Sequence, residues 1–316
     1  MTETNNKGST MAGHRIDVHH HFYPPDLKDV LGGGPTKDWT VQSSLNEMDD
    51  HEFASVALSA SSIPPDWWRH DDAWLRSTTR RFNEFGAEMV KDRPDRFGLF
   101  AFLPMRDVEG SLAEIEYAFD TLGADGVGIA TNFGDLWPGD PDCAPVFDEL
   151  NRRSALVYIH PTVPFCCQGL FGFSDSLVEY PFDTCRAILS LLFSGTFHRC
   201  RNIRFVFCHA GGVLPALTGR IEWGIARMKD VATIMPDGYL AEIARLHFDT
   251  ATSGNSIAMD ALKAVAPVSQ ILFGSDYPYG RIGMNLDGLH ACGLSEDELK
   301  AIERDNALRL VPRLAG

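Results

Sequence analysis

The 316-residue sequence predicts an α/β protein built as a single (β/α)8 barrel. Two observations lead to this prediction: eight short apolar runs recur along the chain, and segments with helical periodicity separate most of them. The chain is also long enough, since such a barrel typically takes about 250 residues in one domain. No GxGxxG or P-loop pattern follows any of the runs, so a nucleotide-binding open sheet is not indicated.

The eight apolar runs have the character of buried parallel strands. Each is short, rich in β-branched or aromatic residues, and bounded by turn-forming residues. In chain order they are Arg15–His19, Ser55–Ser59, Phe97–Leu103, Gly126–Thr131, Leu156–His160, Ile203–His209, Leu246–Thr250 and Ile271–Ser275. Eight strands that alternate with helices favour a closed barrel over a doubly wound open sheet.

Helical periodicity fills the intervals between the runs. The expected helices are Asp71–Val90, Val108–Leu122, Cys143–Arg153, Pro181–Gly195, Val213–Arg227 and Ile257–Ala264. A final helix is expected to begin after Ser295, because Glu298 three residues later completes a capping box. The polar residues 1–12 are expected to form a disordered tail before a barrel domain of residues 13–316, and the Phe- and Gly-rich segment 164–175 a mobile loop.

The composition restricts the classes of partner. There are 43 acidic residues against 28 lysines and arginines, and a net charge of −15 disfavours nucleic acid and anionic membrane surfaces. The seven cysteines are odd in number, form no CxxC pair and follow no apolar leader, so we expect reduced thiols in a cytoplasmic protein. No apolar run approaches the roughly 18 residues of a membrane span.

Three consecutive histidines, His19, His20 and His21, end the first predicted strand. Alternate side chains of a strand share a face, so His19 and His21 can point into the barrel mouth while His20 points away. Two imidazoles at this spacing can bind one metal ion. A tag remnant is the alternative explanation, but the cluster has only three histidines and lies within an apolar strand.

Three further polar residues fall at the ends of predicted strands: His160 ends the fifth, His209 the sixth, and Asp276 follows the eighth. The active site of a (β/α)8 barrel lies at the carboxyl ends of its strands, so these side chains should converge. Each alone could be a polar residue of a βα turn. Together they favour shared coordination of a cation, because a buried histidine or aspartate without a partner is costly.

Other residues near the predicted strand ends could contact a substrate. Six aromatic residues could form a wall for a planar substrate, although packing in the core would explain each of them equally well: Phe22, Trp67, Trp68, Phe165, Phe171 and Phe173. Ser61 could touch a ligand or stabilise a turn, and Asp249 could orient a neighbour or cap a helix. Cys166 and Cys167 have no evident base beside them, which disfavours nucleophilic catalysis.

The strings IDVHHHFYPP, YIHPT, FCHAGG and LFGSDYP resemble the amidohydrolase superfamily. They are most similar to its mononuclear decarboxylase branch, which includes aminocarboxymuconate-semialdehyde and γ-resorcylate decarboxylases. The string SLVEYPFDTCRAILSLLFSG also resembles relatives of 6-methylsalicylate decarboxylase. The resemblance extends over residues 15–314.

The resemblance implies that His19, His21, His160 and Asp276 bind one divalent ion and that His209 is an acid/base. Binuclear members of the superfamily carry a carboxylated lysine at the end of the fourth strand, where this chain reads GVGIATN and has none. Zinc suits a histidine-rich ligand set, and manganese is also used in this branch, so the ligand types leave both open. The resemblance further implies a homodimer or homotetramer.

We therefore expect a metal-dependent carboxy-lyase that decarboxylates a small aromatic or conjugated hydroxy acid, of the ortho-hydroxybenzoate type, without oxidation. The metal would bind the carboxylate and the ortho oxygen, and either His209 or Asp276 would protonate the carbon that loses CO2. Two alternatives stay open. One is a metal-dependent hydrolase or hydratase acting on a lactone, amide or unsaturated acid on the same barrel, and the other is a catalytically silent metal barrel that serves in binding or assembly.

Overall fold

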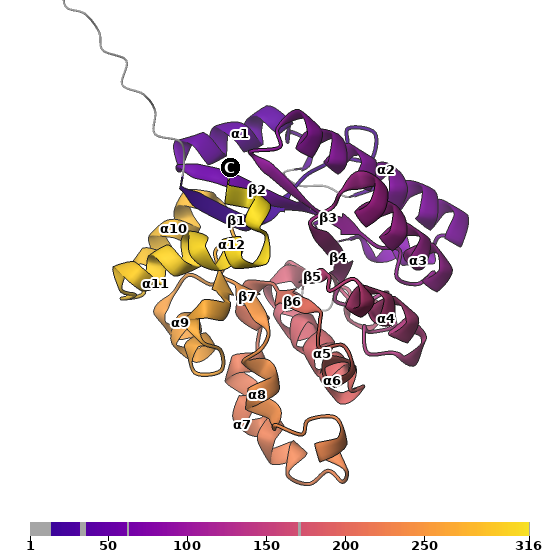
Figure 1. The fold of residues 1–316 in the computed structure, drawn as a ribbon, viewed down its shortest axis with the longest axis vertical. Coiled ribbons are helices and arrows are strands. Elements are labelled where there is room, and N and C mark those ends of the chain that lie inside the picture. The colour runs from indigo at the N-terminus through magenta and orange to yellow at the C-terminus, as the bar shows by residue number, and fades with distance from the viewer. Residues whose placement is uncertain (1–13, 32–35, 62, 170–171, 316) are drawn as a thin grey trace, which may run out of the picture.

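The computed structural model describes residues 14–31, 36–61, 63–169 and 172–315. Eight parallel strands lie side by side in chain order, with helices around them (Figure 1). They are β1 Arg15–His21, β2 Phe53–Ser59, β3 Phe97–Phe102, β4 Gly126–Ala130, β5 Leu156–His160, β6 Arg204–Phe207, β7 His247–Asp249 and β8 Ile271–Leu272. The Val18 amide donates to the Phe273 carbonyl at 3.1 Å, and His20 pairs with Tyr277, so β1 also meets the β8 segment. The predicted (β/α)8 barrel is confirmed.

All eight predicted strands are present, and their ends differ from the prediction in an informative way. β1 continues to His21, whereas β6 ends at Phe207, before His209, and β8 ends at Leu272, before Asp276. His209 and Asp276 have φ of 54° and 62°, in the left-handed region that a strand cannot contain. Both candidate site residues therefore lie in turns just beyond the strands.

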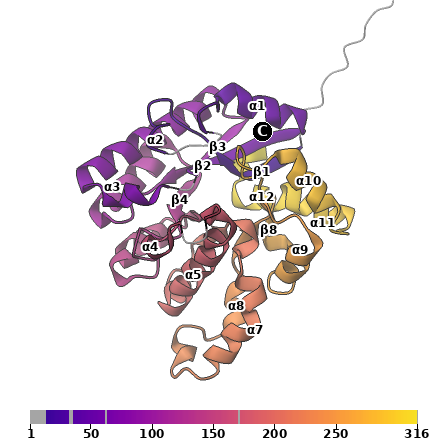
Figure 2. The same ribbon diagram turned by 180° about the vertical axis from the view of Figure 1, so that it is seen from behind.

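The helices form the outer layer, seen from the opposite side in Figure 2. They are α1 Val41–Asp50, α2 Asp72–Asp92, α3 Val108–Tyr117, α4 Ala144–Arg152, α5 Glu179–Phe193, α6 Thr196–Arg199, α7 Leu214–Ile225, α8 Tyr239–Ile243, α9 Ser256–Lys263, α10 Ile282–His290, α11 Glu296–Lys300 and α12 Asn306–Leu310. The predicted helices are found, and the capping box of Ser295 and Glu298 is present. Helices α1, α6, α8 and α10 were not predicted from the sequence; α10 contains two glycines, which are poor helix formers, and α6 and α8 are only four and five residues long.

The C-terminal segment covers one end of the barrel. Ser55, near the start of β2, donates its hydroxyl to the Leu314 carbonyl at 2.8 Å, and Arg204 of β6 donates to the Leu310 carbonyl at 3.1 Å. Apolar side chains of the strands form one cluster with side chains of this segment. The strands contribute Ile16, Val18, Ala57, Phe100 and Tyr158, and the segment contributes Leu310, Val311 and Leu314. The carboxyl ends of the strands meet at the opposite end, which is where the active site of a (β/α)8 barrel lies.

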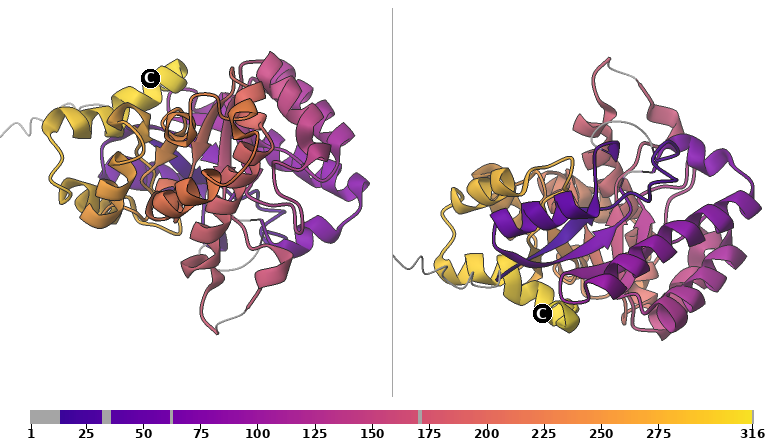
Figure 3. Two further views of the ribbon diagram at one scale, coloured as in Figure 1. Left: turned by 90° about the horizontal axis from the view of Figure 1, so that it is seen from below. Right: turned by 90° about the horizontal axis from the view of Figure 1, so that it is seen from above.

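The segment that joins β5 to α5 projects from the body of the barrel (Figure 3). It contains two short 3-10 turns, Phe165–Cys167 and Asp175–Leu177. Residues 170–171 of the predicted loop 164–175, like the predicted tail 1–12, lie outside the described residues, and the mobility of the loop stays a prediction. Within the described chain, none of the helices is both long and apolar enough to cross a membrane.

Candidate active site

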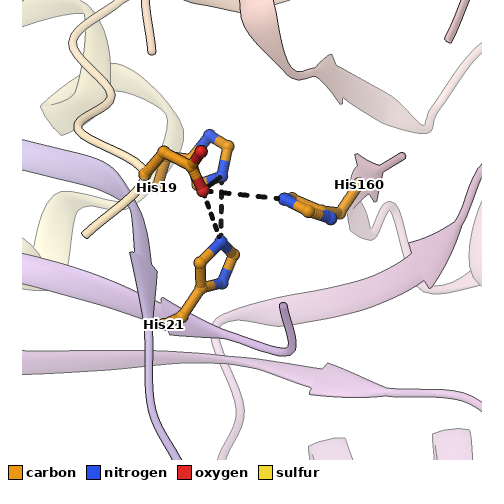
Figure 4. A group of neighbouring side chains, drawn as sticks. His19, His21 and His160 are labelled. Atoms are coloured by element: carbon orange, nitrogen blue, oxygen red, sulfur yellow. Dashed lines mark hydrogen bonds and ion pairs between the residues drawn. The ribbon is translucent and has the colours of Figure 1, made fainter. Parts of the chain in front are cut away.

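Four side chains from distant parts of the sequence converge at the carboxyl end of the barrel. His19 and His21 come from β1, His160 ends β5, and Asp276 follows β8. Figure 4 shows the three imidazole rings directed toward one point. Asp276 Oδ1 lies 3.0 Å from His21 Nε2 and 3.2 Å from His19 Nε2. The same oxygen lies 4.0 Å from His160 Nε2, and the Nε2 atoms of His19 and His21 are 3.1 Å apart.

The far nitrogen of each ring is held by an oxygen that can only accept a hydrogen bond. His19 Nδ1 lies 2.9 Å from Asp249 Oδ2. His21 Nδ1 lies 3.3 Å from the Ser59 carbonyl, and His160 Nδ1 lies 3.0 Å from the Pro161 carbonyl. The hydrogen of each neutral ring is thereby placed on Nδ1. The Nε2 lone pairs of all three rings consequently face the centre of the group.

Burial and charge reinforce this arrangement. Burial lowers the pKa of His160 to about 3 and also lowers the pKa of His21, which keeps both rings neutral. Burial alone would lower the pKa of His19 and raise that of Asp276, but opposite charges reverse both effects. The pKa of His19 is raised because the Asp249 and Asp276 carboxylates flank its ring, and the pKa of Asp276 is lowered by His19. The centre thus favours a positive charge between these groups.

This donor set fits one divalent metal ion. When all three rings are neutral, as metal binding requires, nitrogen lone pairs and a carboxylate oxygen lie together with no hydrogen between them, a repulsive arrangement unless a cation lies among them. The buried Nε2 of His160 has no hydrogen-bond partner among the described residues. Ligand atoms around a tetrahedral zinc ion lie roughly 3.3–3.4 Å from one another. The separations among His19, His21 and Asp276 are close to this value, whereas His160 Nε2 lies farther out, 4.0 Å from Asp276 Oδ1. His19, Cys208 and Asp249 form a second close group, but burial raises the pKa of the Cys208 thiol to about 12, so it stays protonated.

A buried carboxylate behind this centre fixes the two segments that carry it. Asp17 Oδ1 accepts from the backbone amides of His19 at 2.9 Å and Ser275 at 3.0 Å. Its Oδ2 accepts from the Ser275 hydroxyl at 2.6 Å and lies 3.2 Å from His20 Nδ1. Asp17 therefore joins the His19 backbone to the turn before Asp276. Asp17 was not among the site residues predicted from the sequence, although an aspartate inside an apolar strand is itself an unusual signal.

The middle histidine belongs to this supporting network. His20 Nε2 lies 2.9 Å from the Ser44 hydroxyl of α1, and its ring stacks on Tyr277 with 4.8 Å between centroids. It lies on the side of β1 away from the His19 and His21 rings, as strand alternation requires. Gly274 shows how closely the segments approach, because a Cβ there would lie only 2.9 Å from the Cβ of His19.

His209 lies beside the group of His19, His21, His160 and Asp276 but does not belong to it. Its ring centroid is 5.0 Å from that of His19. His209 Nδ1 lies 3.0 Å from the Ala251 carbonyl, which fixes a hydrogen on Nδ1 and leaves Nε2 for proton exchange. Its backbone amide donates to Asp249 Oδ1 at 2.9 Å. Asp249, for which the sequence left a positioning or a capping role open, thus contacts both His19 and His209.

A cavity of about 680 Å³ opens above these residues. His160, His209, Asp276, Thr252 and Tyr279 line its polar side. Much of the remaining wall is apolar and comes from several loops: Leu31, Ile63, Pro64, Pro65, Val163 and Leu177. This apolar wall was not predicted from the sequence, because nothing in the local pattern of these loops indicates that they line one pocket.

None of the described residues of the predicted aromatic wall lines this pocket. Phe22 is fully buried against Phe82 of α2, with 4.3 Å between ring centroids. Trp67 and Trp68 are buried against the Phe102 ring. These large rings therefore pack on side chains of α2 and β3, where burial removes their apolar surface from water.

The remaining predicted contacts lie beside the pocket rather than along its wall. The Arg69 guanidinium lies over the Phe165 ring, 4.3 Å from the centroid of that ring. Phe173 is half exposed, and Phe171 lies outside the described residues. Ser61 lines a much smaller cavity that also touches His160, and its buried hydroxyl has no hydrogen-bond partner in the described part of the chain.

Known proteins resemble this chain along nearly its whole length. The sequence profile of the Amidohydrolase family (Amidohydro_2) matches residues 16–313. Decarboxylase yanB from Aspergillus niger is 33% identical over 95% of this chain and 88% of its own length. The 6-methylsalicylic acid decarboxylase of Penicillium expansum is 32% identical over 96% of this chain and 97% of its own.

Solved structures share the same barrel. The crystal structure of an amidohydrolase II superposes with a TM-score of 0.85 at 28% identity, covering 94% of this chain and 99% of that one. The dihydroxybenzoic acid decarboxylase of a Polaromonas species, solved with bound manganese and an inhibitor, has a TM-score of 0.78 at 24% identity. The match covers 95% of this chain and 97% of that one. Because the identity is only 24%, this similarity shows only that the two proteins share a fold.

Proposed function

The chain belongs to the Amidohydrolase family, and on this premise we propose that it is a metal-dependent, non-oxidative decarboxylase of ortho-hydroxybenzoate-type acids. Such an enzyme is a carbon–carbon lyase, and the similar fungal proteins bear decarboxylase names. The single observation that carries the proposal is the convergence of His19, His21, His160 and Asp276 beneath a pocket that His209 also lines.

In this proposal the four converging residues hold one divalent ion. When bound, that ion supplies positive charge for a substrate carboxylate and its ortho oxygen. Three imidazoles and one carboxylate favour zinc, so we propose zinc as the native ion. The manganese in the Polaromonas structure makes manganese the ion to test against it.

We assign proton delivery to His209. Its Nδ1 hydrogen bond to the Ala251 carbonyl fixes the ring and leaves Nε2 to exchange a proton on the pocket side. Protonation of the ring carbon that bears the carboxylate interrupts aromaticity. The bond to the carboxylate then breaks, its electrons restore the aromatic ring, and CO2 leaves. Asp276 also lines the pocket and is the other candidate donor.

The test is the identity of the products. Purified protein is incubated with 2-hydroxybenzoates, and released CO2 and the masses of the organic products are measured. One CO2 per substrate consumed, with the corresponding phenol, is expected. A product that has gained water instead would establish a hydrolase or hydratase and overturn the proposal.

The variant His209→Asn tests the proton donor in the same assay. It should keep its metal but lose about 10²–10⁴-fold in kcat, the usual contribution of a general acid. His198→Asn, at an exposed histidine on α6, is the matched control and should retain wild-type turnover. Undiminished turnover in His209→Asn would transfer the donor role to Asp276.

A further inference from the structure

Two adjacent cysteines lie in the segment that joins β5 to α5. The Sγ atoms of Cys166 and Cys167 are 2.6 Å apart, and both thiols are free. Cys166 is exposed and Cys167 is half-buried, so a small reagent in solution can reach the pair. Neither residue belongs to the described lining of the pocket. Substrate binding therefore does not explain why the two thiols lie together.

The other cysteines are protected from oxidants. Four of them are buried: Cys143, Cys185, Cys200 and Cys208. Burial raises the pKa of the Cys143 and Cys208 thiols to about 12 and that of Cys185 to about 11, and a protonated thiol is a poor nucleophile. Cys292 is half-buried and donates its thiol to the Gly288 carbonyl at 3.2 Å. An oxidant is therefore expected to react first at the adjacent pair.

The two thiols of the pair are not equivalent. The hydrogen bond between them raises the pKa of Cys167 to about 11, so Cys167 keeps its proton. Cys166 is the more exposed of the two and meets a dissolved oxidant first. If Cys166 is oxidised to a sulfenic acid, the Cys167 sulfur already lies beside it and can attack it. The pair thus has the arrangement of an attacking and a resolving cysteine.

A disulfide between neighbours in the sequence is easily reduced. Adjacent Cα atoms are about 3.8 Å apart across a trans peptide bond, whereas the two Cα atoms of most disulfides are roughly 4.4–6.8 Å apart. The bond would therefore form under strain. Strained and exposed disulfides are the ones that are readily reversed.

The pair lies in the same segment as part of the pocket wall. Val163 precedes it and Leu177 follows it, and both line the pocket. The Cys167 amide donates to the Pro164 carbonyl at 3.1 Å and closes the 3-10 turn Phe165–Cys167. The Phe165 amide fixes this turn by donating to the Gly134 carbonyl at 2.8 Å. Strain introduced within the turn should therefore reach the wall at Val163.

We propose that Cys166 and Cys167 are a reversible oxidation site, at which a hydroperoxide converts the two thiols to a disulfide and thereby weakens ligand binding in the pocket. The Cys166 thiolate attacks one peroxide oxygen, the O–O bond breaks, and the other oxygen leaves with the proton that Cys166 gave up. The Cys167 sulfur then attacks the sulfenic sulfur, the S–S bond forms, and the hydroxyl leaves as water with the Cys167 proton. The two sulfurs lose two electrons, which reduce the peroxide.

The first experiment counts thiols. Metal-loaded protein is titrated with hydrogen peroxide and then unfolded, and its free thiols and peptide masses are measured. The seven thiols should fall to five, the peptide that contains Cys166 and Cys167 should be lighter by two hydrogens, and dithiothreitol should restore all seven.

Cys292→Ser is the matched control and should lose the same two thiols, whereas Cys166→Ser should form no disulfide. An unchanged thiol count, oxidation at a different cysteine, or disulfide-linked dimers would overturn the oxidation site.

The second experiment measures calorimetric binding of 2-hydroxybenzoate. Peroxide should weaken its affinity for the wild type about threefold to tenfold, the size expected if one wall side chain leaves its preferred rotamer, and dithiothreitol should restore it. Cys166→Ser should keep its affinity after the same treatment. Equal weakening in Cys166→Ser, or none in the oxidised wild type, would overturn the effect on the pocket.

This inference goes beyond the proposed function, and the two can fail separately. If the reduced protein neither binds 2-hydroxybenzoates nor releases CO2 from them, the proposed function fails. The thiol count still decides whether the adjacent cysteines are an oxidation site.

Discussion

The two sides of the pocket differ in how firmly their side chains are held. On the side of β1, β7 and β8, the buried carboxylates of Asp17 and Asp249 each accept four hydrogen bonds within the barrel. On the side of the β5–α5 segment, Leu177 is largely exposed, and the hydroxyls of Ser174 and Ser176 bond to each other at 2.7 Å. The first side is preorganised for chemistry, while the second can vary without disturbing it.

The largest effect is expected from a substitution of Asp249, whose carboxylate bonds to both His19 and His209. Asp249→Asn replaces an acceptor with a group that can also donate, so it weakens the hold on His19 Nδ1 and on the His209 backbone. We expect metal affinity to fall about 10–100-fold, with a still larger loss in kcat. Chelator competition and steady-state kinetics measure the two.

Asp260→Asn, at an exposed aspartate on α9, is the matched control for Asp249→Asn. It should leave both metal affinity and kcat at their wild-type values. If Asp249→Asn bound metal with wild-type affinity, the hydrogen bonds of Asp249 would not be what positions the side chains for metal binding.

A smaller effect is expected from Asp17→Asn, because Asp17 acts on the ligands only through the backbone of His19 and the Ser275 turn. Metal affinity should fall about tenfold, and the free energy of unfolding should drop by about 1–3 kcal/mol as buried donors lose acceptors. Chelator competition and urea unfolding of the metal-free protein give the two values. A loss of stability without any change in metal affinity would restrict Asp17 to a structural role.

One contribution to the pH dependence of stability is expected from a residue distant from both sides of the pocket. Burial lowers the pKa of His247, at the start of β7, to about 4. The folded state therefore favours the neutral ring, and its contribution is present above pH 6.5, the pKa of the unfolded chain, and is lost as the pH falls toward 4.

Between pH 6.5 and 5 the loss from His247 should be about 1–2 kcal/mol in the free energy of unfolding, and His247→Gln should remove it. Urea unfolding of both proteins at several pH values measures this. If the free energy of unfolding fell equally with pH in the wild type and in His247→Gln, the acid destabilisation would come from other groups, such as the buried histidines of the site.

The smallest effect is expected from Leu177→Ala. Because this side chain is 69% exposed in the free protein, its removal should change the free energy of unfolding by less than about 0.5 kcal/mol. A loss above 2 kcal/mol in urea unfolding would show that the β5–α5 side is as tightly packed as the opposite one, and the contrast between them would disappear.

The parts of this site that the sequence could predict are those governed by strand periodicity. Alternation in β1 places His19 and His21 on one face, and the barrel brings strand ends together, so His160 and Asp276 could be grouped without coordinates. Asp17 could not be recognised, since its hydrogen bonds join it to Ser275, which is distant in sequence.

The pocket wall could not be predicted for a related reason. Phe22 directly follows β1, and Trp67 and Trp68 lie in the connection after β2, yet all three are buried against other core rings instead of lining the pocket. Leu31 and Leu177 meet at the pocket from loops that share no sequence pattern. The direction in which a residue leaves a strand is decided by tertiary packing rather than by local composition.

The central claim, a single metal ion held by four converging side chains, is tested most directly by the metal content of the purified chain. Elemental analysis after dialysis should find one zinc or manganese ion per chain in the wild type. The double variant His19→Ala/His21→Ala should contain none while its circular dichroism is unchanged. Two ions per chain, or a metal-free protein whose activity is indifferent to chelator, would contradict this account.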